Sequence, residues 1–201
     1  MKNIFFLFFL CVPLAFTNAQ EFDKQISNAK SAYESGNYEE SRLAVQNALH
    51  EIDVKIGQEV LAILPQKVNS MAYVAANDQV AGSEANFVGL FIERTWGTTE
   101  TGSLEFSVIS DSPLIGTVNT FLSLPSIMYG SDSNQKKIKV EGFKAMLEKK
   151  VDENNAVTGY SLMLPYSNSL LQLNYTGETT EDAFLAMVNQ IPVTKVTEIA
   201  R

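Results

Sequence analysis

Apolar side chains recur at helical intervals from residue 21 to about residue 65. In the first part of this region, Phe22, Ile26, Ala29 and Tyr33 are separated by four, three and four positions, which places them on one face of a helix. Gly36 follows, and glycine is common immediately after the end of a helix. The pattern predicts a helix that begins near residue 21 and ends before Gly36.

A second helix is predicted directly after this glycine. Asn37 and Glu40 have the spacing of a capping box, in which two side chains satisfy backbone groups at a helix N-terminus. Pro65 ends the pattern because proline lacks the backbone N–H that a helix needs. One apolar stripe runs between these limits: Val45, Leu49, Ile52, Ile56, Val60 and Ile63. The two segments together predict a helical hairpin with a long second arm.

From about residue 73 the apolar period changes from helical to alternating. Leu104, Phe106 and Val108 alternate with Glu105 and Ser107, as in a strand with one buried and one solvated face. Further strands are expected at residues 87–96, 138–140, 143–147, 160–164 and 171–175. The fold class is therefore α+β, with an N-terminal helical hairpin followed by a mostly antiparallel, meandering sheet with flanking helices.

Residues 112–131 form a twenty-residue stretch without a charged side chain. Ser112 and Pro113 suit a helix start, and Pro125 limits the helix to about eleven residues, too few to span a bilayer. Its apolar positions predict a helix that covers the sheet. The opposite side is small and uncharged, so it could instead meet a partner or line a cleft. The candidate contacts on that side are Thr117, Asn119 and Thr120.

Two elements are expected near the C-terminus. A helix over residues 181–190 would bury Phe184 and Met187 and would be capped by Thr179 and Asp182. The tail from Val193 onward is interpreted as a last short strand.

The first nineteen residues have the layout of a secretory signal peptide. One lysine precedes an apolar run of about a dozen residues, and small residues follow before the favoured cleavage point after Ala19. An uncleaved anchor is the alternative. The expected organisation is a signal peptide at 1–19, the helical hairpin at 20–65 and an antiparallel α+β domain at 66–201, exported to the periplasm or the extracellular space, with no integral membrane span after cleavage.

Composition removes several functional classes. The single cysteine, Cys11, lies in the predicted signal, so the mature chain has no thiol chemistry or disulfide. Without Lys2, 14 basic and 23 acidic residues leave a net charge of −9, which argues against a nucleic-acid partner.

Catalytic and metal-binding motifs are absent from the sequence. His50 is the only histidine, and no phosphate loop, nucleophile elbow or zinc motif is present. Two polar turns, around Asp132 and Asp152, lack the rest of a calcium loop. Trp96 could be an exposed binding platform, although closure of the core is the favoured interpretation. We expect no enzyme activity, no cofactor and no metal.

The segment from Ala32 to Leu49 resembles the centre of a tetratricopeptide repeat. Gly36-Asn37-Tyr38 matches its turn, and Ser41 and Ala48 match its small residues. The resemblance covers about residues 22–53, in a single copy, whereas such arrays need about three. It implies a hairpin and, more weakly, protein binding.

The expected function is that of a non-enzymatic exported envelope protein that binds another protein through the hairpin or the sheet. Tyr33, Tyr38 and Trp96 are the candidate contacts outside the 113–123 helix. The alternative is a carrier or sensor of a small apolar ligand, held in a cleft under that helix.

Overall fold

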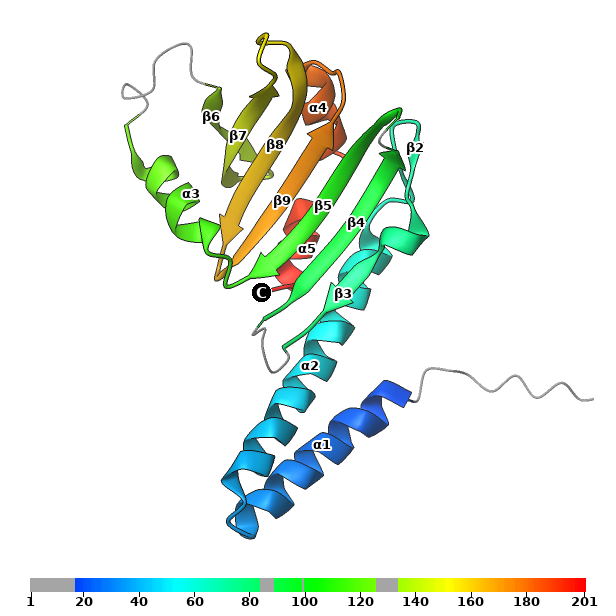
Figure 1. Cartoon of the computed structure of the whole chain (residues 1–201), viewed down its shortest axis with the longest axis vertical. Coiled ribbons are helices and arrows are strands. Elements are labelled where there is room, and N and C mark those ends of the chain that lie inside the picture. Colours follow the sequence, from blue (N-terminus) through cyan, green and yellow to red (C-terminus); the bar gives the residue numbers. More distant parts are fainter. Residues whose placement is uncertain (1–16, 84–88, 99, 126–133) are drawn as a thin grey trace, which may run out of the picture.

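The structure is a computed structural model that describes residues 17–83, 89–98, 100–125 and 134–201 (Figure 1). The predicted signal peptide falls mostly outside the described residues, because they begin at residue 17. Within the described residues, no helix combines the length and apolar character needed to cross a membrane.

The α+β prediction is confirmed, because a helical hairpin precedes a seven-stranded antiparallel sheet (Figure 1). The strand order is β3-β4-β5-β9-β8-β7-β6. Their bounds are β3 Gln79–Ala81, β4 Phe91–Thr98, β5 Gly102–Ser110, β6 Gln135–Val140, β7 Phe143–Val151, β8 Val157–Tyr166 and β9 Ser169–Thr176. Strands β6 to β9 form a meander, and the chain reaches its far edge from β5 by way of helix α3, Leu114–Ser123.

One face of the sheet carries the main core. Its strands contribute the alternating positions that the sequence indicated, among them Leu104, Phe106 and Val108, all fully buried. The end of α2, Tyr38–Ile63, covers this face together with α4, Glu181–Val188, and α5, Val193–Ile199. Trp96 lies in this core with its ring fully buried, and its indole N–H donates to the Pro65 carbonyl at 2.8 Å. It therefore belongs to no exposed surface.

The opposite face of the sheet is only partly covered. Helix α3 packs Val118 and Phe121 against Met146 and Leu170, which form a second, smaller apolar cluster. Leu114, one of the apolar positions expected to cover the sheet, is instead 44% exposed. The helix begins one residue later than expected, after Pro113, although the Ser112 hydroxyl still accepts a hydrogen bond from the Leu114 N–H at 3.4 Å.

The hairpin consists of α1, Thr17–Glu34, and α2, and it extends away from the sheet (Figure 1). Asn37 caps α2 as predicted, since its side chain accepts a hydrogen bond from the Glu40 N–H. The second half of the capping box is not formed, because the Glu40 carboxylate accepts from the Asn37 side-chain amide while the Asn37 N–H donates to the Ala32 carbonyl. Small residues occupy the seam between the helices: Ala29, Ala32, Ser41, Ala44 and Ala48 are all buried. The Ser41 hydroxyl donates to the Ala29 carbonyl across the seam at 2.8 Å.

One buried cation joins the hairpin to the sheet. Arg94, on the core face of β4, donates to both carboxylate oxygens of Asp78, at 2.9 and 2.5 Å. The same guanidinium donates to the carbonyls of Leu61 and Leu64 at the C-terminal end of α2, at 2.8 and 3.4 Å. A cation at a helix C-terminus interacts favourably with the helix dipole and satisfies carbonyls that lack helical partners.

Three expectations need correction. The tail is helix α5 and not a strand, because Val193, Val196 and Ala200 are spaced three and four apart and all face the core. Thr180, and not Thr179, caps α4 by accepting from the Ala183 N–H. The strand expected at 87–96 is described from Phe91 to Thr98.

The remaining elements are short. They are β1, Lys67–Val68, its antiparallel partner β2, Met71–Ala72, and the 3-10 turn η2, Ala75–Asn77. They connect the end of α2 to the edge strand β3.

We predict that Arg94→Met lowers the free energy of unfolding by about 3–5 kcal/mol, because it leaves the Asp78 carboxylate without its buried cation. Urea denaturation would measure this. The matched control is Lys55→Met, which breaks the exposed Lys55–Glu59 pair and should cost about 0–1 kcal/mol. Equal effects of the two variants would show that Arg94 does not anchor the helix.

Candidate protein-binding surface

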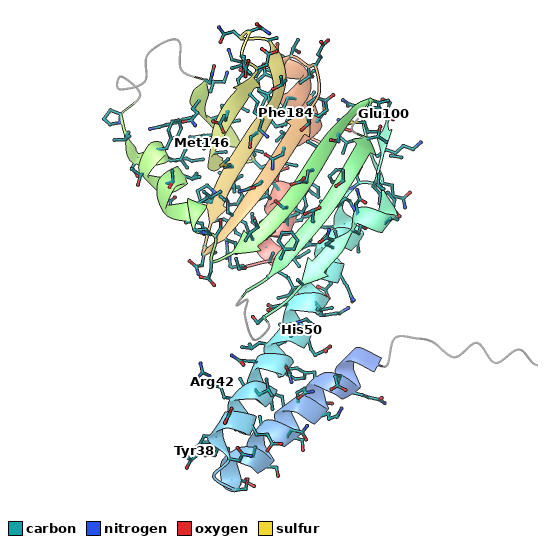
Figure 2. All side chains as sticks on the ribbon, in the orientation of Figure 1. Tyr38, Arg42, His50, Glu100, Met146 and Phe184 are labelled. Atoms are coloured by element: carbon teal, nitrogen blue, oxygen red, sulfur yellow. The ribbon has the colours of Figure 1, made fainter. Side chains whose placement is uncertain are left out.

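Six large apolar side chains on one side of the hairpin are exposed, with exposed fractions of 42–66%. They are Ile26 and Tyr33 on α1, and Tyr38, Val45, Leu49 and Ile52 on α2. We call this set the hairpin face. Figure 2 places Tyr38 at the tip of the hairpin, far from Met146 and Phe184 in the sheet domain.

The helical geometry places both stripes on the same side of the hairpin. At 100° per residue, the hairpin-face residues of each helix lie about 80° around the helix axis from the buried seam residues of that helix. The sense of this rotation is the same in both helices. Because the two helices run antiparallel, equal rotations bring the stripes to one common side. The rings of Tyr33 and Tyr38 confirm this at the turn, since their centroids are 5.5 Å apart in an edge-to-face arrangement.

The small seam residues explain why these side chains remain outside. Ala29, Ala44 and Ala48 allow the helix backbones to approach closely, and the larger residues lie beside the seam instead of within it. Leu43 is also exposed, at 50%, but it lies on the opposite side of α2 from the Val45–Leu49–Ile52 stripe.

Sequence reasoning identified Tyr33 and Tyr38 as candidate contacts, and the structure brings them together. It missed Ile26, Val45, Leu49 and Ile52 as surface residues, because an apolar stripe normally predicts burial. The available signal was the row of small residues beside the stripe, which matches a helix seam better than the stripe does.

The candidate contacts on α3 lie on a separate surface. Thr117, Asn119 and Thr120 are exposed, and the Thr120 hydroxyl donates to the Gly116 carbonyl within the helix. Asn119 lines an open cleft of about 390 Å³ beside the helix.

The part of the sheet beyond α3 is polar and open. Glu93 on β4 and Glu105 on β5 lie diagonally across this face, and Glu93 is directly opposite Ser107. Partial burial, with a smaller contribution from Glu105, raises the pKa of Glu93. Within the described parts of the chain, no group of three or more His, Cys, Asp or Glu side chains could hold a metal ion.

Comparison with known proteins adds no assignment to this geometry. Scans against protein-family models, curated proteins and solved structures each found no match.

We predict that Glu93→Gln raises the melting temperature at neutral pH by about 1–3 °C, because it removes a partly buried carboxylate charge and, to a smaller extent, its repulsion from Glu105. A carboxyl whose pKa is raised in the folded state binds its proton more tightly there than in the unfolded chain. The charged carboxylate of Glu93 therefore destabilises the folded state at pH values above its raised pKa. This penalty becomes smaller as the pH falls and disappears below the ordinary pKa of a glutamate in the unfolded chain.

Thermal melts from neutral to acidic pH test this, and the difference between the two proteins should vanish at the acidic end. Glu153→Gln, in an exposed turn, is the control and should leave the melting temperature unchanged. A lower melting temperature for Glu93→Gln at neutral pH would contradict the argument.

Proposed function

We propose that this is a non-enzymatic, exported envelope protein that binds another protein through the hairpin face. The observation that supports the proposal is the gathering of six exposed, large apolar side chains on one side of two packed helices. Single exposed apolar residues are ordinary, whereas contiguous ones mark interaction sites in soluble proteins.

The partner that fits this surface best is an amphipathic helix. Two antiparallel helices with apolar stripes on the same side form a groove in which a third helix can place its own apolar residues. From Tyr38 to Ile52 the α2 stripe covers about 21 Å at 1.5 Å per residue, which matches about four turns of a partner helix.

The charge of the hairpin favours a basic partner over a second copy of this chain. Residues 21–59 contain eight acidic and four basic side chains, a net charge of −4. Two such hairpins would repel one another, while lysine or arginine residues beside the apolar stripe of a partner helix would be attracted.

Export is supported by the signal-like pattern of residues 1–19, and the absence of enzyme activity by the lack of catalytic motifs. A carrier of a small apolar ligand under α3 is less well supported, because Val118 and Phe121 fill the space between that helix and the sheet.

We predict that Leu49→Lys abolishes capture of the partner while changing the free energy of unfolding by less than about 0.5 kcal/mol, as usual for exposed positions. The matched control is Leu43→Lys, which makes the same chemical change on the other side of the same helix. Envelope extracts would be passed over immobilised wild-type protein and both variants, with retained proteins quantified by mass spectrometry.

A protein retained by wild type and Leu43→Lys but lost with Leu49→Lys supports the proposal. Equal retention of the same envelope proteins by the wild type and both variants would contradict the proposal. The competing possibility is that a second copy of this chain covers the hairpin face, and sedimentation of the purified wild type and both variants tests it. A wild-type dimer that only Leu49→Lys disrupts would show that the occupant is a second copy and not a partner helix.

A further inference from the structure

The strands β6 and β7 concentrate positive charge in an acidic protein. Residues 135–151 contain six lysines and two glutamates, although the whole chain has a net charge of −8. Lysines on an edge strand such as β6 are expected, because they discourage pairing with another sheet. Lys144 needs another reason, because it lies on the interior strand β7.

Lys144 lies directly opposite Lys139 in the register of β6 and β7. Like charges in this position destabilise a sheet. Both side chains are exposed, and neither has an ion-pair or hydrogen-bond partner among the residues that the structure describes. The pair thus has an electrostatic cost that no contact in the described fold offsets.

Two adjoining hollows meet at Lys144 and Leu122, beside the C-terminal half of α3. The first, of about 390 Å³, is lined by Asn119, Leu122, Ser123, Lys144 and Pro165. The second, of about 320 Å³, shares Leu122 and Lys144 and adds Lys137, Ile138 and Lys139. The combined cleft has ammonium and amide donors together with apolar side chains.

The C-terminus of α3 lies beside this cleft, but it does not repel an anion there. The C-terminus of a helix carries partial negative charge on its free carbonyls. The ammonium of Lys137 donates to the carbonyls of Leu122 and Leu124, and so places a full positive charge against that end. The other two lysines remain available to a ligand.

We propose that this cleft binds a phosphate group, held by the ammonium groups of Lys139 and Lys144 and by the side-chain amide of Asn119. Lysine interacts with phosphate as a point charge, whereas a planar carboxylate is matched best by the fork of arginine, and this cleft contains no arginine. The volume exceeds that of phosphate alone, so the bound molecule is an organic phosphate whose remainder contacts Leu122 and Pro165.

Two sources could provide this group, a soluble organic phosphate or the headgroup of a phospholipid. Glycerol 3-phosphate is the soluble probe, and phosphatidylcholine vesicles with and without phosphatidic acid are the lipid probe. The full chain is used throughout, at constant ionic strength in sodium chloride, so that general screening of charge does not differ between samples.

The decisive variant is Lys144→Gln, which should weaken binding about tenfold or more because it removes a charged hydrogen-bond donor. Without a probe, the same variant should melt at the same or a higher temperature than wild type, because repulsion from Lys139 is relieved. The matched control is Lys149→Gln, which removes an exposed lysine from the same strand but from the opposite face of the sheet.

Binding is measured by calorimetry for glycerol 3-phosphate and by flotation for the vesicles. Binding of the soluble probe by wild type and Lys149→Gln, but not by Lys144→Gln, supports the proposal with a soluble ligand. The same result only with phosphatidic acid vesicles supports it with a lipid headgroup. No binding of either probe, or equal losses in the two variants, overturns it.

Discussion

The arrangement of the whole molecule depends on the hydrogen bonds of one buried guanidinium. Arg94 extends from the middle of β4 and binds the Asp78 carboxylate and the last carbonyls of α2, while its charge lies 4.5 Å from the ring centroid of Tyr73. A buried charge is tolerated only when its donors are satisfied and it is paired. These contacts fix where α2 meets the sheet, and thereby the direction in which the hairpin projects (Figure 1).

Packing in the hairpin then decides what the projecting helices present to solvent. A seam of alanine and serine lets the two helix backbones approach closely. The approach is close enough for the Ser41 hydroxyl on α2 to donate a hydrogen bond to the Ala29 carbonyl on α1. The larger side chains, such as Leu49, lie beside that seam and remain exposed. The exposed hairpin face is thus a consequence of close helix packing combined with a fixed helix direction.

The two proposed surfaces differ in chemistry and in place. The hairpin face is apolar within an acidic segment, and the cleft at β6 and β7 is basic with apolar walls. The sheet separates them, because β6 lies at the edge opposite β3, and β3 and its neighbour β4 are the strands packed against α2. A protein helix and an organic phosphate could occupy these sites without competing for space.

The sequence by itself determined the elements that rest on local interactions. The Asn37 cap on the Glu40 N–H and the alternation through Phe106 need only neighbouring residues, and both are present as predicted. Tertiary structure decided the rest. Helical spacing cannot tell whether the stripe through Val45 meets a partner within the chain, and the pairing of Lys139 with Lys144 exists only through strand register. These are long-range relations, which depend on how distant segments pack and not on the residues beside them.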